Sequence, residues 1–174
     1  MSKTDLSERL SQMVAAADRE RANKQSAIAN RHAADGMLQS GNFFVAQNDA
    51  LKAIYDNALN AMVDHALSVC APSVAASAVK TAGLTLESTF LDRFGAILSG
   101  TASGNACPPK ASDKLLSDFR THLREKLNQA VSDASNNVAG KPVRGWQGWI
   151  IRYGWNGINT AIALLALYLS WVKK

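Results

Sequence analysis

Three histidines, His32, His65 and His122, are the side chains of this 174-residue chain best suited to acid–base chemistry near neutral pH. Asp118 precedes His122 by four positions, and on a helix this spacing places both side chains on one face. A carboxylate in that position orients the imidazole of many general bases, but the same spacing is common in solvated ion pairs. The sequence has neither a nucleophile elbow nor a phosphate-binding glycine loop. We therefore predict no catalytic residue and a non-enzymatic protein.

The two cysteines, Cys70 and Cys107, are the remaining candidates for redox or metal chemistry. They lie far apart in the sequence, and no histidine stands at a ligand spacing from either of them. We predict no metal site and no cofactor, and we expect both side chains to remain thiols in a reducing cytosol.

The last part of the chain contains its strongest physical signal. Residues 153–172 (YGWNGINTAIALLALYLSWV) contain no charged side chain. Twenty helical residues extend about 30 Å, which matches the hydrocarbon thickness of a bilayer. The alternative is a buried helix of a water-soluble bundle, which would need a polar face that residues 161–169 lack, apart from Tyr168. We predict a single C-terminal transmembrane helix over 153–172.

Aromatic and basic residues flank this span, as is typical of the two membrane interfaces. The juxtamembrane segment 140–152 and the ends of the span supply the predicted interface residues: Lys141, Arg144, Trp146, Trp149, Arg152, Tyr153, Trp155, Trp171, Lys173 and Lys174.

The net charge of +5 comes from these flanks. Of nineteen Lys and Arg residues, five lie at 141, 144, 152, 173 and 174, and the other fourteen match the fourteen Asp and Glu residues of 1–139. A nucleic-acid-binding domain would carry its basic excess on the folded body, so we predict no nucleic-acid partner and contact with anionic lipid headgroups instead. Lys141, Arg144 and Arg152 precede the span, so the positive-inside tendency places 1–139 in the cytoplasm. The expected location is the bacterial inner membrane.

Polar and small residues lie along one side of the predicted span. The set is Asn156, Gly157, Asn159, Thr160, Ala163 and Ser170. Lipid cannot satisfy an amide, so a face of this kind favours contact with other membrane helices. We predict that these residues form an oligomer or pore face; hydration of the two asparagines at headgroup depth is the alternative.

Residues 1–139 read as a cytoplasmic bundle of four to five antiparallel helices. Expected helices cover 4–35, 42–69, 73–82, a stretch from Thr85 to about Leu98, and 112–136, with caps at Thr4, Asn42, Thr85 and Ser112 and a stop at Gly83. The clearest apolar stripes are Leu51, Ile54, Tyr55, Ala58, Leu59, Met62, Val63 and Ala66, and Leu116, Phe119, Leu123, Leu127, Ala130 and Ala134. The stripe of the first helix fades after Ala17, so we interpret residues 1–40 either as a partly exposed arm or as a helix that finds its partner in another subunit.

Two functions follow from this organisation. In the first, a membrane-anchored helical protein homo-oligomerises and forms a pore or perturbs the membrane, as small toxins and phage-defence effectors do. In the second, a non-enzymatic scaffold or accessory subunit tethers a larger complex to the membrane through its cytoplasmic helices, with a protein partner bound at residues 1–35.

Overall fold

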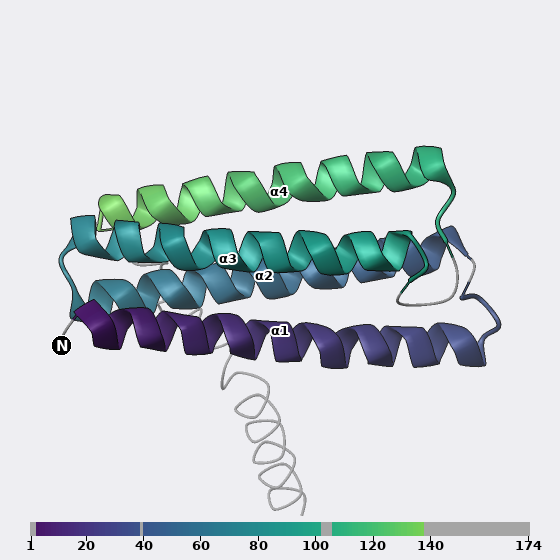
Figure 1. Ribbon diagram of the computed structural model, residues 1–174, viewed down its shortest axis with the longest axis horizontal. Coiled ribbons are helices and arrows are strands. Elements are labelled where there is room, and N and C mark those ends of the chain that lie inside the picture. Colours follow the sequence, from purple (N-terminus) through teal and green to yellow (C-terminus); the bar gives the residue numbers. More distant parts are fainter. Residues whose placement is uncertain (1–2, 39, 102–105, 138–174) are drawn as a thin grey trace, which may run out of the picture. The chain divides into compact units, whose positions relative to one another are not determined.

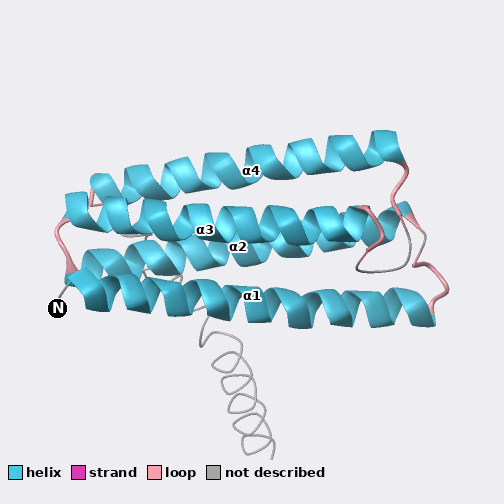
Figure 2. Cartoon of the chain, viewed as in Figure 1, coloured by secondary structure: helices cyan, strands magenta, loops and turns pink. Residues whose placement is uncertain are grey.

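The computed structural model describes residues 3–38, 40–101 and 106–137, which form four α-helices joined by short connections (Figure 1). The helices are α1 (Lys3–Ala34), α2 (Gly41–Val69), α3 (Pro72–Leu98) and α4 (Pro109–Ser135). All regular elements in these ranges are helical (Figure 2), as the absence of period-two patterning predicts. The prediction of an all-α bundle is confirmed for this part of the chain.

The two central helices of the bundle are α2 and α3. Each of them contacts α1 and α4 as well as the other, whereas the described residues of α1 and α4 do not touch. Consecutive helices run in opposite directions, so α1 and α3 are parallel neighbours on one side (Figure 1). Residues 1–40, left open by the sequence, therefore contain a helix that packs along α2 and α3.

Buried apolar side chains fill the space between the helices at three- and four-residue steps. The rings of Tyr55 and Phe90 lie 5.8 Å apart between α2 and α3, and those of Phe94 and Phe119 lie 4.7 Å apart between α3 and α4. The stripes predicted for α2 and α4 are buried, except that Ala58 and Leu116 are half-buried at their edges. Packing of these stripes, rather than helix propensity, holds the long helices together.

The third helix differs from the expectation. Gly83 does not end a helix and Thr85 does not cap one, because α3 is continuous through both residues. A Cβ at Gly83 would collide with Leu127 Cδ1 and lie 3.3 Å from Leu59 Cδ2. The glycine therefore serves the close approach of α2, α3 and α4, and the predicted break was wrong.

Two of the predicted caps were also wrong. The α2 N-cap is Ser40, whose hydroxyl accepts a hydrogen bond from the Phe43 amide at 3.3 Å, rather than Asn42. The fourth helix begins at Pro109, three residues before Ser112, because proline suits a first helical turn.

The juxtamembrane segment 140–152 and the predicted span 153–172 lie outside the described residues. Within the described ranges, none of the four helices has the length and apolarity that a membrane crossing requires.

Candidate functional site

The residues predicted from the sequence as an oligomer face and as a membrane interface all lie outside the described residues. They are Asn156, Gly157, Asn159, Thr160, Ala163 and Ser170 for the oligomer face and Lys141, Arg144, Trp146, Trp149, Arg152, Tyr153, Trp155, Trp171, Lys173 and Lys174 for the interface. The structural features that can serve a function therefore belong to the bundle.

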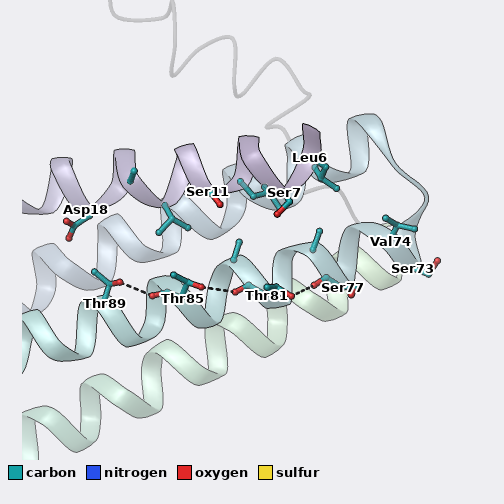
Figure 3. A pocket seen from close by; sticks show the side chains of 15 residues that line it. Leu6, Ser7, Ser11, Asp18, Ser73, Val74, Ser77, Thr81, Thr85 and Thr89 are labelled. Atoms are coloured by element: carbon teal, nitrogen blue, oxygen red, sulfur yellow. Dashed lines mark hydrogen bonds between the residues drawn. The ribbon is translucent and has the colours of Figure 1, made fainter. Parts of the chain in front are cut away.

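A groove of about 710 Å³ runs between the parallel helices α1 and α3 (Figure 3). We name it the α1–α3 groove. Its α1 wall extends from Leu6 to Asp18 and its α3 wall from Ser73 to Thr89, so the walls are roughly 18 and 24 Å long. A length of this kind matches three to four turns of a helix rather than a compact small molecule.

Small side chains keep the groove open. The α1 wall carries Ser7, Ser11 and Ala15 at four-residue steps, and the α3 wall carries Ala78 and Ala82. Residues of this size let two helices approach but leave the space beside them unfilled. Leu6 and Leu10 are almost fully buried and lie deeper in the wall.

The hydroxyl groups of the α3 wall are bonded to their own helix. Thr81 donates to the Ser77 carbonyl at 3.1 Å, Thr85 to the Thr81 carbonyl at 3.3 Å, and Thr89 to the Thr85 carbonyl at 2.9 Å (Figure 3). A hydroxyl bonded in this way has little left to offer a ligand, and the threonine methyl groups add apolar surface. The wall is therefore less polar than its composition suggests.

Charge is scarce in the groove. Asp18 is the one ionisable side chain among the residues that line it, and its carboxylate accepts a hydrogen bond from Arg21 Nε at 2.6 Å. A groove with one carboxylate, already paired to Arg21, suits an apolar helical surface better than a charged or strongly polar ligand.

On its other side, α1 meets α2 through polar side chains, which we name the α1–α2 polar seam: Arg21, Gln25, His32, Gln47 and Asn48. Gln47 is 1% exposed and donates from Nε2 to the Gln25 backbone carbonyl at 3.2 Å. Four buried atoms of the seam have no hydrogen-bond partner among the described residues: Gln25 Nε2, His32 Nδ1, Gln47 Oε1 and Asn48 Oδ1. Each such atom costs about 1–3 kcal/mol, so this interface is weaker than an apolar one.

A second group of polar residues lies around α2, α3 and α4. His122 Nε2 lies 3.0 Å from Asp56 Oδ1, so the carboxylate that pairs with this nitrogen comes from α2 and not from Asp118 of the same helix. Arg124 donates to the buried Glu87 at 3.3 Å. Burial, and to a lesser degree the charges of Glu87 and Asp56, raise the pKa of Tyr55 well above its usual range.

The titratable residues of this group lie in pairs. Within the described ranges, no group of three or more His, Cys, Asp or Glu side chains is placed to hold a metal ion. Cys70 and Cys107 are free thiols, and burial raises the pKa of the Cys107 thiol. The pair His122–Asp56 joins α4 to α2, and the pair Arg124–Glu87 joins α4 to α3.

A protein partner was predicted from the sequence for residues 1–35, which include the α1 wall of the groove, but no residue of the α3 wall was predicted as a site. A signal was present, since Ser77, Thr81, Thr85 and Thr89 recur every four residues on a face opposite the apolar stripe. Nothing in the sequence showed that α1 would lie beside that face. Searches of family models, of curated proteins and of solved structures find no match to this chain.

Proposed function

We propose that this protein is a membrane-anchored, non-enzymatic helical protein that homo-oligomerises in the bacterial inner membrane. Its bundle lies in the cytoplasm, and the C-terminal helices of several copies cluster, forming a pore or perturbing the bilayer. The observation that carries the proposal is the uncharged run 153–172, which follows a charge-balanced stretch of sequence and has polar and small residues at helical spacing.

The polar face is the part of the proposal that concerns membrane activity. Asn159 and Thr160 follow Asn156 by three and four positions, so the predicted helix would place all three on one side, and their polar groups would be unsatisfied in lipid. Contact between copies supplies partners for these groups, and a ring of them supplies a polar lining.

Liposome leakage tests this proposal with the full-length protein. We expect the wild-type chain to bind liposomes containing anionic lipid and to release an entrapped dye. Replacement of Asn156, Asn159 and Thr160 by leucine is expected to abolish leakage while the protein still sediments with the liposomes.

The matched control is Asn57→Leu, which changes an exposed asparagine of α2 in the bundle. This variant should leak dye as the wild type does. Wild-type protein that binds the liposomes without releasing dye would overturn the pore proposal, and protein that does not bind them would overturn the membrane anchor as well.

The α1–α3 groove favours a second candidate function, a scaffold that tethers a larger complex to the membrane through its cytoplasmic helices. Its walls carry a single ionisable side chain, Asp18, and are long enough for a partner helix of three to four turns. In this case the wild-type protein leaves liposomes intact and co-purifies with one defined protein. Ser11→Arg with Thr85→Arg, which fills the groove with charge, releases that protein, whereas Thr121→Arg on the exposed surface of α4 does not.

A further inference from the structure

We propose that α1 is exchanged between two copies of the chain, so that α1 of each copy packs on α2 and α3 of the other. The exchange supplies the self-association step of the proposed function and rests on that function. Three features of the described residues carry it: the weak interfaces of α1, the turn that follows α1, and the identity of the surfaces before and after exchange.

The first feature is that α1 is held less firmly than the other helices. Among its described side chains it buries three apolar residues, Leu6, Leu10 and Ala17, whereas α2 buries nine. The α1–α3 groove leaves about 710 Å³ unfilled beside it. The α1–α2 polar seam adds four buried atoms without partners. Local opening of a protein begins where buried apolar contact is least, so α1 is the helix that we expect to detach first.

The second feature is the turn between α1 and α2. Gly36 has φ +67°, the Gly36 amide donates to the Ala33 carbonyl at 3.1 Å, and the Met37 amide donates to the His32 carbonyl at 2.7 Å. This hydrogen-bond pattern is the Schellman motif, which ends a helix at a left-handed residue. Residues 35–40 contain no proline, so the same segment can also continue as helix and join α1 to α2. Glycine permits both conformations.

The third feature identifies the occupant. The surface that a detached α1 leaves on α2 and α3 fits α1 itself, including the bond from Gln47 to the Gln25 carbonyl and the edge-on contact of His32 with Phe43. A second copy of the chain offers an identical α1, so the exchanged dimer needs no new complementary surface. The residues of 1–139 balance in charge, so two bundles approach without net repulsion.

The equilibrium between closed and exchanged forms depends on the turn. Ala at position 36 is strained in the left-handed conformation and favours a continuous helix, so Gly36→Ala is expected to raise the dimer association constant of the full chain in detergent at least tenfold. The matched control is Gly41→Ala, at a glycine with no atom within 4 Å of the added Cβ and no positive φ. Light scattering should show no change for this control. Equal dimer fractions for both variants overturn the proposal.

The α1–α2 polar seam must open before α1 can exchange, so its strength affects the rate of exchange. It does not affect the equilibrium, because the closed and exchanged forms contain the same α1–α2 interface. Gln47→Leu removes the unpaired oxygen together with the bond to the Gln25 carbonyl and places an apolar side chain at this buried position. The net effect should stabilise the interface and slow the mixing of two differently tagged populations severalfold without changing the dimer fraction. The control Gln129→Leu alters an exposed side chain of α4 and should mix at the wild-type rate. A Gln47→Leu variant that mixes as fast as the wild type contradicts the opening of this interface.

A cross-link identifies which copy supplies α1. In a chain with Cys70→Ser and Cys107→Ala, the substitutions Gln25→Cys and Gln47→Cys place two thiols where the Gln47 side chain reaches the Gln25 backbone carbonyl. Treatment of the dimer fraction with a short bis-maleimide cross-linker, which spans more than a disulfide does, should give a covalent dimer on a denaturing gel. A bond formed within one chain, in a protein that light scattering shows to be oligomeric, overturns the exchange and leaves the proposed function standing. A strictly monomeric protein in detergent overturns both.

Discussion

The hydroxyl group of the buried residue Tyr55 destabilises the folded state. Its side chain is fully buried between α2 and α3, and its hydroxyl has no hydrogen-bond partner among the described residues. An unsatisfied buried hydroxyl costs about 1–3 kcal/mol. The aromatic ring, in contrast, packs on Phe90 and belongs to the core.

We expect Tyr55→Phe to raise the free energy of unfolding by about 1 kcal/mol at pH 7, because it removes the unpaired hydroxyl and keeps the ring. The raised pKa of Tyr55 also gives the wild type a pH dependence. Below pH 10 the hydroxyl is protonated in both states, so it contributes no slope. Above pH 10 the unfolded state loses the proton first, and stability falls by up to about 1.4 kcal/mol per pH unit.

Denaturant unfolding of both proteins between pH 7 and pH 11 measures the two effects. The difference in stability between wild type and variant should widen above pH 10. A constant difference across this range would show that Tyr55 ionises equally in the folded and unfolded states.

Gly83 and Gly95 lie in the same helix but have different surroundings. At Gly83 an added Cβ meets the buried side chains of Leu127 and Leu59, whereas at Gly95 it meets no atom within 4 Å. Gly83→Ala should therefore lower stability by about 1–3 kcal/mol through overpacking, and Gly95→Ala should raise it by about 0.5–1 kcal/mol through helix propensity. Thermal unfolding monitored by circular dichroism checks both, and similar effects at the two positions would contradict the close approach of the helices at Gly83.

At the scale of the helices, the apolar stripes in the sequence predicted which faces of α2 and α4 are buried. The stripes of α2 and α4 are long and regular, and their buried positions follow from three- and four-residue steps alone. Helix ends and the continuity of α3 were harder to predict from the sequence, because glycine and serine occur both inside helices and at their ends. Gly83 reads as a stop until Leu127 lies beside it, and Ser40 caps α2 two residues before the expected position.

Substitution of Ser40 and of Ser112 tests which of the two serines caps a helix. We expect Ser40→Ala to lower the free energy of unfolding by about 1 kcal/mol, because the α2 N-terminus loses its cap. Ser112→Ala lies inside α4 and should have an effect within about 0.5 kcal/mol of zero. Chemical denaturation measures both, and a larger loss at Ser112 would restore it as the cap of α4.

The α1–α3 groove could not be predicted, although its residues are visible in the sequence. Hydroxyl residues recur every four positions in α3, and serines recur in α1. These residues line a groove only because α1 and α3 are parallel neighbours. That pairing joins residues more than sixty positions apart. The buried seam of Gln47 and Asn48 was likewise hidden, because amide side chains at those positions read as solvent-exposed.

At the scale of the whole molecule, the proposed self-association fixes the mass of the particle. We expect the detergent-solubilised full chain to have a protein mass that is a multiple of 18.6 kDa, measured by light scattering after subtraction of the bound detergent. A mass of 18.6 kDa at all protein concentrations would contradict self-association.

The position of α1 has a consequence for how the chain is made. A ribosome releases α1 before the helix that forms the other wall of the groove, and α3 is complete only at Leu98. At about 5–20 residues per second, Leu6 and Leu10 wait for several seconds without their full set of neighbours. Chains translated side by side on one message hold their unpaired first helices close together during that interval, so pairs can form before any chain has closed on itself.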